Sequence, residues 1–285
     1  MNAVEKRVKL LQDGLSAALA RLDAGVAPKA VHRLRTTTRR IETLVAHSGS
    51  HLGRKQQKAL QWLTGLRKRV GKIRDLDVQI KLLNAIANGS TANDRRNLCE
   101  YLQGKREKQE ARLASAARKV ERAKFQASVQ RALEKMLASG ESLEISGDAP
   151  LRKAQIQLAQ LAGEYASHPA LRPRRLHELR IRLKAVRYTA EIAEESPEQR
   201  KFLEKMKSVQ DAIGEWHDWR ELEMTAEKRF RDRANCPLLL EIRALHAARY
   251  SAALSAVKGL LAFPAAEQRK PPRPALLPRT SVRRA

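Results

Sequence analysis

One short stretch occurs twice in this chain, and its repetition constrains the fold more than any other feature of the sequence. The first copy is V-H-R-L-R-T-T-T-R-R-I, residues 31–41. On an α-helix of about 3.6 residues per turn, His32, Arg35 and Arg39 share one face beside a neighbouring apolar stripe. Such a helix packs through its apolar stripe and presents a row of cations. The row suits phosphate oxygens, because Arg offers a planar fork of donors and stays charged.

The second copy, residues 176–188, repeats the pattern of a histidine followed by bases. His177 is followed by Arg180, Lys184 and Arg187 at three, seven and ten positions. The two histidines lie 145 positions apart (177 − 32) in a chain of 285 residues. A repeat over this distance predicts a duplicated architecture with one copy in each half.

Apolar residues at helical spacing recur along most of the chain, and no segment shows the sustained alternation that marks a strand. We therefore expect an all-α protein. The predicted helices cover residues 3–23, the first histidine stretch to about 47, most of 92–138, the second histidine stretch to about 195, and a last segment that reaches 263.

A glycine with an aspartate four positions later follows the third apolar stripe of each half. Gly71 precedes Asp75, and Gly214 precedes Asp218, with an offset of 143 (214 − 71). We interpret each segment as a helix interruption and restart, with Asp75 as a plausible N-cap. This offset agrees with that of the histidines to within two positions, which supports two repeated halves.

The boundary between the halves is predicted in residues 139–150, a run that contains Gly, Ser and Pro. We assign residues 1–146 to an N-terminal half and residues 147–263 to a C-terminal half. Residues 264–285 are basic and rich in proline, with little apolar surface to bury, so we expect a disordered tail.

The charge of the chain calls for a polyanionic partner or for tolerance of strong self-repulsion. There are 57 Lys and Arg against 31 Asp and Glu, a formal net charge of +26. Candidate partners are nucleic acid, an anionic membrane and a non-nucleotide polyphosphate. Only 4% of the residues are aromatic, which disfavours a single-stranded nucleic-acid binder, because such proteins stack bases on aromatic rings.

Two distant cysteines, Cys99 and Cys236, predict neither a disulfide framework nor a zinc site. Residues 1–15 lack the apolar core of a signal peptide, and no apolar run approaches the roughly 20 residues of a membrane span. We expect a soluble, cytoplasmic protein with no membrane partner, no metal and no cofactor.

The two histidine helices and the two glycine segments together resemble the CHAD family, the conserved histidine α-helical domain. The resemblance covers residues 1–263 and is carried by residues 31–40, 66–78, 176–188 and 206–218. It implies an all-α fold of two four-helix-bundle halves related by a pseudo-twofold, with a basic central groove or pore. It also implies binding of inorganic polyphosphate. The acidic E-x-E-x-K strand pattern of a triphosphate-tunnel domain is absent, so the chain resembles the stand-alone form of the family.

The resemblance carries polyphosphate binding onto cations and histidines of these four segments by position. They are His32, Arg35, Arg39, Arg40, Arg74, His177, Arg180, Lys184, Arg187, Lys207 and His217. The sequence departs from the family pattern at Glu42 and Ala185, each of which replaces a usual base. The two halves are therefore not expected to contribute equally.

Three functions are candidates for this chain. The leading one is a binding module for long-chain inorganic polyphosphate, which would bring the protein to polyphosphate granules. The second is nucleic-acid binding, which charge alone supports, with no recognised nucleic-acid motif. The third is a phosphohydrolase, in which His32, His177 or the neighbouring pair His217 and Asp218 serves as nucleophile or general base. Because the sequence has no H-E-x-x-H motif and no P-loop, we expect no catalytic residues and no enzyme.

Several candidate residues also have a purely structural interpretation. His32 and His177 could be buried histidines that pack between helices and donate a hydrogen bond to a backbone carbonyl or an Asp. Arg187 could pair with Glu191, one helical turn further on. Asp75 and Asp218 could cap helices or pair with arginines, and a histidine surrounded by several arginines should stay neutral.

Overall fold

The computed structural model describes the helical part of the chain. The described residues are 3–23, 27–47, 52–86, 91–118, 122–138, 147–166, 171–233 and 236–261. The predicted tail at 264–285 and most of the predicted boundary at 139–150 lie outside them.

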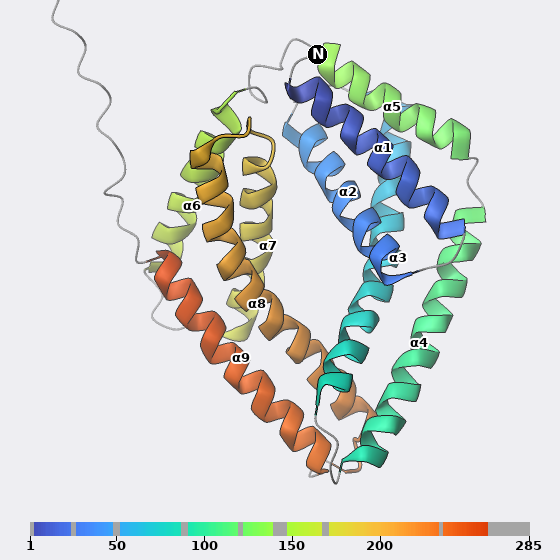
Figure 1. Ribbon diagram of the computed structural model, residues 1–285, viewed down its shortest axis with the longest axis vertical. Helices are drawn as coiled ribbons and strands as arrows, with labels where there is room; N and C mark the ends of the chain where they lie inside the picture. Colours follow the sequence, from blue (N-terminus) through green and yellow to red (C-terminus); the bar gives the residue numbers. More distant parts are fainter. Residues whose placement is uncertain are drawn as a thin grey trace, which may run out of the picture.

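Within these ranges the structure is all-helical and contains no strand, as predicted (Figure 1). The helices of the N-terminal half are α1 (Ala3–Asp23), α2 (Pro28–His47), α3 (Arg54–Ala85), α4 (Ala92–Arg118) and α5 (Arg122–Ala138). Those of the C-terminal half are α6 (Ala149–Ala166), α7 (Pro173–Ala190), α8 (Pro197–Arg229) and α9 (Pro237–Leu261).

The bounds of α1 and the end of α2 agree with the sequence, but the predicted interruptions at the two glycines are wrong. Helix α3 runs through Gly71 and α8 runs through Gly214. In α3 the buried face continues across the glycine through Val70, Ile73 and Leu76. Burial of this face outweighs the roughly 1 kcal/mol that one glycine costs in a helix interior. Asp75 is therefore an interior helical residue and not an N-cap.

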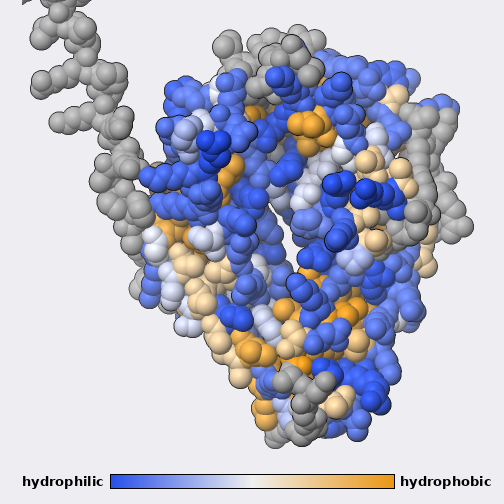
Figure 2. Space-filling model, viewed as in Figure 1, coloured by the Kyte–Doolittle hydropathy of each residue, from blue (hydrophilic) through white to orange (hydrophobic). Residues whose placement is uncertain are grey.

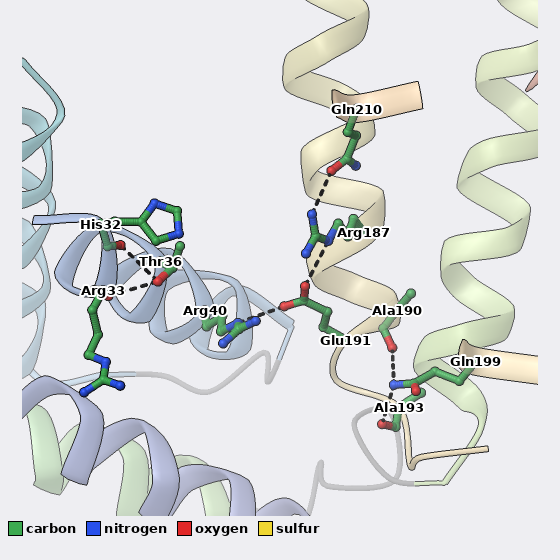
Figure 3. A network of polar contacts seen from close by, with 10 residues as sticks. All are labelled: His32, Arg33, Thr36, Arg40, Arg187, Ala190, Glu191, Ala193, Gln199 and Gln210. Carbon is green, nitrogen blue, oxygen red and sulfur yellow. Dashed lines mark hydrogen bonds and ion pairs between the residues drawn. The ribbon is translucent and has the colours of Figure 1, made fainter. Parts of the chain in front are cut away.

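The turn between α7 and α8 is held by side chains at its two ends. Ser196 is the N-cap of α8, and its hydroxyl accepts a hydrogen bond of 3.1 Å from the backbone N–H of Gln199. The buried Gln199 side chain donates to the carbonyls of Ala190 and Ala193, each at 3.2 Å (Figure 3). Helix α7 therefore ends about one turn before the predicted residue 195, and the residues just after it have a fixed position.

The core consists of three apolar clusters. The first is built mainly by α1, α2, α3 and α5, and the second by α6, α7, α8 and α9. The third joins the ends of α3 and α4 to the ends of α8 and α9 and includes the fully buried Leu83 and Leu222. Figure 1 shows the result as two arms that meet at their lower end. The two halves therefore share one apolar cluster.

A second junction lies near the other end of the arms. Ile192, which follows α7, is buried in the first cluster and so belongs to the core of the opposite half. Helices α2 and α7 are in contact, and α3 is in contact with α8. The molecule is thus closed at both ends around a central region flanked by α2, α3, α7 and α8.

Helix order is the same in the two halves for the first four helices. Helix α2 begins at Pro28 and α7 at Pro173, an offset of 145 (173 − 28). Helices α3 and α8 begin 143 positions apart (197 − 54). Helix α5 has no counterpart among the described residues. The origin of the halves by duplication stays a prediction.

None of the described helices combines the length and the apolar composition needed to cross a membrane.

Replacing Leu83 by Ala tests whether the shared cluster couples the halves. Leu83 is fully buried, so we expect its truncation to lower the free energy of unfolding by about 3 kcal/mol. Because both halves build this cluster, amide hydrogen exchange should accelerate in α8 and α9 as well as in α3 and α4. The half-exposed Leu240, replaced by Ala, is the control and should change stability by less than about 0.5 kcal/mol. Acceleration confined to the N-terminal half would contradict the coupling.

Candidate functional site

The cation rows of α2 and α7 meet in the central region because the apolar stripes of these helices pack elsewhere. Leu34 and Ile41 of α2 are buried in the first cluster, and Leu179 and Leu183 of α7 are buried in the second. The neighbouring cationic faces are left toward the junction of the halves. Figure 2 shows the surface hollowed there, with hydrophilic residues on both sides of the hollow.

On the side of α2, Arg35 lies across α3. Its Nη1 is 3.5 Å from Oδ1 of Asp75. A Cβ atom built on Gly71 would approach the same Nη1 to 2.7 Å, so the missing side chain at position 71 makes room for the guanidinium. At Gly214, the matching position of α8, no described atom lies within 4 Å of such a Cβ. The glycine of α3 therefore positions a site residue, whereas the glycine of α8 has no comparable role.

On the side of α7, Arg180 and Lys184 are half-buried. In addition to burial, the charges of Arg35 and Arg39 on α2 contribute to a lowered pKa of each. Burial lowers the pKa of Lys184 to about 7, together with the charges of Arg180, Arg35 and Arg39. The pKa of Arg180 is also lowered by burial, and its buried Nε has no hydrogen-bond partner among the described residues. The two rows are thus close enough to repel each other across the junction.

Two carboxylates lie among these cations. Burial raises the pKa of Asp218, Arg180 opposes this shift, and Asp75 adds to it. Asp218 in turn partly offsets the lowering of the Lys184 pKa. A third carboxylate, Glu221, interacts electrostatically with Asp75 and Arg180. The cations of the cluster still outnumber its carboxylates: Arg35, Arg39, Arg74, Arg180 and Lys184 against Asp75, Asp218 and Glu221. The cluster therefore keeps an excess of positive charge, and the carboxylates act as partners of arginines.

The three candidate histidines lie in the same region. The rings of His177 and His217 have centroids 5.0 Å apart. Burial, followed by the charges of Arg180 and its neighbours, lowers the pKa of His217 to about 3. Desolvation of its ring by neighbouring groups, although His32 is exposed overall, and the charges of Arg74 and Arg35 likewise lower the pKa of His32. All three are thus neutral near pH 7 while no anion is bound, as expected for histidines among arginines.

The packing interpretation is wrong for His32 and stays a prediction for His177, whose half-buried ring lies against that of His217 on α8. His32 is exposed, so it does not fill a core position. Nδ1 of His177 and Nδ1 of His217 are buried without a hydrogen-bond partner in the described part of the chain. The described residues contain no group of three or more His, Cys, Asp or Glu arranged to hold a metal ion.

Comparison with known proteins identifies the family to which this chain belongs. The sequence matches the family model of the CHAD domain over residues 9–227. The chain belongs to the CHAD family. The crystal structure of the CHAD domain from the plant Ricinus communis superimposes with a TM-score of 0.64 at 17% sequence identity, covering 89% of this chain and 88% of that one. No curated protein matches the sequence. Membership of the CHAD family is consistent with polyphosphate binding in general.

Two residues predicted to bind ligand in this CHAD domain are engaged by a buried carboxylate. Glu191 accepts a hydrogen bond of 2.8 Å from Nε of Arg40 and one of 3.0 Å from Nε of Arg187 (Figure 3). Its side chain is 8% exposed, against 44% for Arg40 and 33% for Arg187. The alternative pairing of Arg187 with Glu191 is thus confirmed. Because Arg40 belongs to α2 and Glu191 follows α7, this pair also joins the halves.

The departure from the family pattern at Glu42 has a local explanation. Glu42 accepts hydrogen bonds from Thr64 at 2.6 Å and from Arg67 at 3.1 Å, both on α3. At the matching place in the other half, Arg187 donates to Gln210 of α8 at 3.3 Å. The CHAD chain thus keeps a contact between the two helices in each half, with the arginine on α3 in the first half and on α7 in the second.

Lys207 and Arg220 are both on α8, but only Arg220 acts on the cluster residues. Lys207 is exposed and precedes Asp218 by 11 positions, or about three turns, so both are on one face of the helix. Arg220 was not predicted, yet its charge lowers the pKa values of His177 and His217. Its guanidinium lies 5.9 Å from the ring centroid of the buried Trp216. Arg220 follows His217 by three positions and so lies on the same face of the helix, and this spacing is the sequence signal for Arg220.

The two glycines offer a matched pair of substitutions. Alanine at either position improves helix propensity by up to about 1 kcal/mol. We expect Gly214→Ala to raise stability and leave the affinity for inorganic polyphosphate unchanged. Gly71→Ala should displace the Arg35 guanidinium and weaken that affinity at least threefold, with no loss of stability. Equal affinities of the two variants in a binding titration would contradict the positioning role of Gly71.

Proposed function

We propose that the chain binds inorganic polyphosphate in the central region between α2, α3, α7 and α8, without transforming it chemically. The observation that carries the proposal is the mutual repulsion of the two cation rows. Lys184 of α7 has its pKa lowered to about 7 by burial and by cations that include Arg35 and Arg39 of α2. A polyanion placed between the rows would offset this repulsion.

Polyphosphate suits the chemistry of this region. Its repeating phosphate groups offer only oxygen acceptors, which arginine and lysine bind by charge-assisted hydrogen bonds. Binding releases counterions, so affinity should fall steeply as salt rises. A linear chain engages several weak contacts at once, so affinity should grow with chain length.

Nucleic acid suits the region less well. Trp216 and Trp219 of α8 are buried in the apolar clusters, at 0% and 5% exposure, so neither offers a face on which a base could stack. The net charge of +26 supports only a non-specific, salt-sensitive attraction to nucleic acid.

A binding role is also favoured over catalysis. With a pKa of about 3, His217 is a weak base near neutral pH, and the pKa of His177 is lowered as well. Asp218 contributes to the electrostatics of Arg180 and Lys184, which supports a role as a partner of cations. We further propose that the retained binding of long chains brings the protein to polyphosphate granules in the cytoplasm.

A titration at about 0.2 M salt, where exposed charges are largely screened, tests the proposal. The ligands are long-chain polyphosphate, tripolyphosphate and duplex DNA at matched phosphate concentration. Reversing the charge of Arg35 and Arg180 to Glu should lower affinity for the long chain at least tenfold. The control is Lys58→Glu with Lys201→Glu, two exposed residues that lie 143 positions apart and outside the residues assigned to the site. Equal binding of DNA, or equal losses in both double variants, would contradict a dedicated polyphosphate site.

The lowered pKa of Lys184 predicts proton uptake on binding. In the free protein this amine loses its proton above about pH 7, whereas adjacent phosphate favours the ammonium and raises its pKa. Binding at pH 8 should therefore take up a proton, and affinity should fall as pH rises from 7 to 9. Calorimetry in two buffers of different ionisation enthalpy measures the uptake. Lys184→Arg should retain affinity and lose most of the uptake, and unchanged uptake would rule out Lys184 as its source.

A further inference from the structure

A second group of cations lies outside the central region, in an open groove between α3 and α4. The groove has a volume of about 310 Å³. It is lined by Arg69 and Lys72 of α3 and by Gln109, Arg112, Ser115 and Ala116 of α4. Three of these residues are cations, two carry neutral hydrogen-bonding groups, and no carboxylate is among them.

The two walls of this groove are fixed by the first apolar cluster. Val70 and Ile73 alternate with the cations of α3 and are fully buried. Leu113 of α4, next to Arg112, is 1% exposed in the same cluster. The backbone positions from which the cations extend are therefore held by packing, although the charged ends are exposed.

The carboxylates near this groove are paired with another arginine. Arg106 of α4 donates to Asp77 of α3 at 2.6 Å and to Glu110 at 2.5 Å. Arg69, Lys72 and Arg112 are exposed and have no ion-pair partner among the described residues. Three like charges thus line one groove, and no described acidic group neutralises them.

The groove is lined by α3 and α4, whereas the central region is flanked by α2, α3, α7 and α8. At about 100° per residue, Lys72 is turned by roughly 100° and Arg69 by roughly 160° from Gly71, over which Arg35 lies. Arg35 contacts Asp75, which is turned by roughly 120° from Arg69 and by roughly 60° from Lys72, so Arg69 is on a different side of α3 and Lys72 lies between the two sides. None of the central cations is among the residues that line the groove.

We propose that the groove between α3 and α4 is a second anion site, which binds a short oligophosphate segment through Arg69, Lys72 and Arg112. Two guanidinium forks and one ammonium suit several neighbouring phosphate groups, and Gln109 and Ser115 offer neutral donors to the remaining oxygens. No aromatic side chain lines the groove, so phosphate is recognised without a base. The inference rests on the proposed function only for the choice of phosphate chain as ligand.

The test compares three proteins with the wild type. The groove variant replaces Arg69, Lys72 and Arg112 by Gln. The charge-matched control replaces the exposed Lys58, Lys201 and Lys258 by Gln. The third protein carries Arg35→Glu and Arg180→Glu in the central region. The number of tripolyphosphate molecules bound and their affinities are measured by equilibrium dialysis, and circular dichroism checks the fold of each variant.

We expect the groove variant to lose one tripolyphosphate site, or to weaken it at least tenfold, while the control keeps it. The same number and affinity in the groove variant and the control would overturn the proposal. If the central variant binds like the wild type while the groove variant loses a site, the proposed function fails and the groove site stands.

A second ligand, long-chain polyphosphate, distinguishes a segment of a long chain from a free short oligophosphate as the occupant of the groove. If long-chain polyphosphate also binds more weakly to the groove variant than to the control, the groove holds part of the same long chain. If only tripolyphosphate binding weakens, the groove takes a free short oligophosphate. Either result supports the anion site.

Discussion

The structure depends on holding two rows of like charge beside each other against their repulsion. The rows of α2 and α7 lie on faces that neighbour the buried stripes, so their distance is set by how the arms are joined. The shared cluster around Leu83 and Leu222 joins the arms at one end. At the other end, Ile192 enters the opposite core and Glu191 joins Arg40 to Arg187. Packing at both ends thus offsets the Coulomb repulsion in the middle.

The carboxylates of the central region fit the same balance. Asp75 contacts Arg35, and Asp218 lies near Arg180 and Lys184, so part of the repulsion is offset within each half. A region with cations alone would be costly to hold together, whereas full neutralisation would leave nothing for an anion to bind. The excess of cations over carboxylates lies between these limits, and the pKa of Lys184 near 7 reflects it.

Much of this arrangement was predictable from local patterns. Helical spacing gave α1 and α2, and the histidine repeat located both cation rows, because each is a property of one helix. The pairing of Arg187 with Glu191 was also within reach, since the two lie one turn apart. Three features were not: the continuity of α3 through Gly71, the contact of Arg40 with Glu191 across 151 positions, and the groove beside Arg112. Each depends on tertiary packing, which periodicity within one helix does not report.

The shared cluster has a consequence for the history of the fold. A single half, isolated from the other, would expose Leu76 and Leu83, or Trp219 and Leu222, at the free end of its arm. Soluble monomers rarely tolerate an apolar patch of this kind. If the two halves descend from one ancestral gene, its product had to associate with a second copy to cover that patch. A symmetric pair of identical arms would then have come before their fusion into one polypeptide.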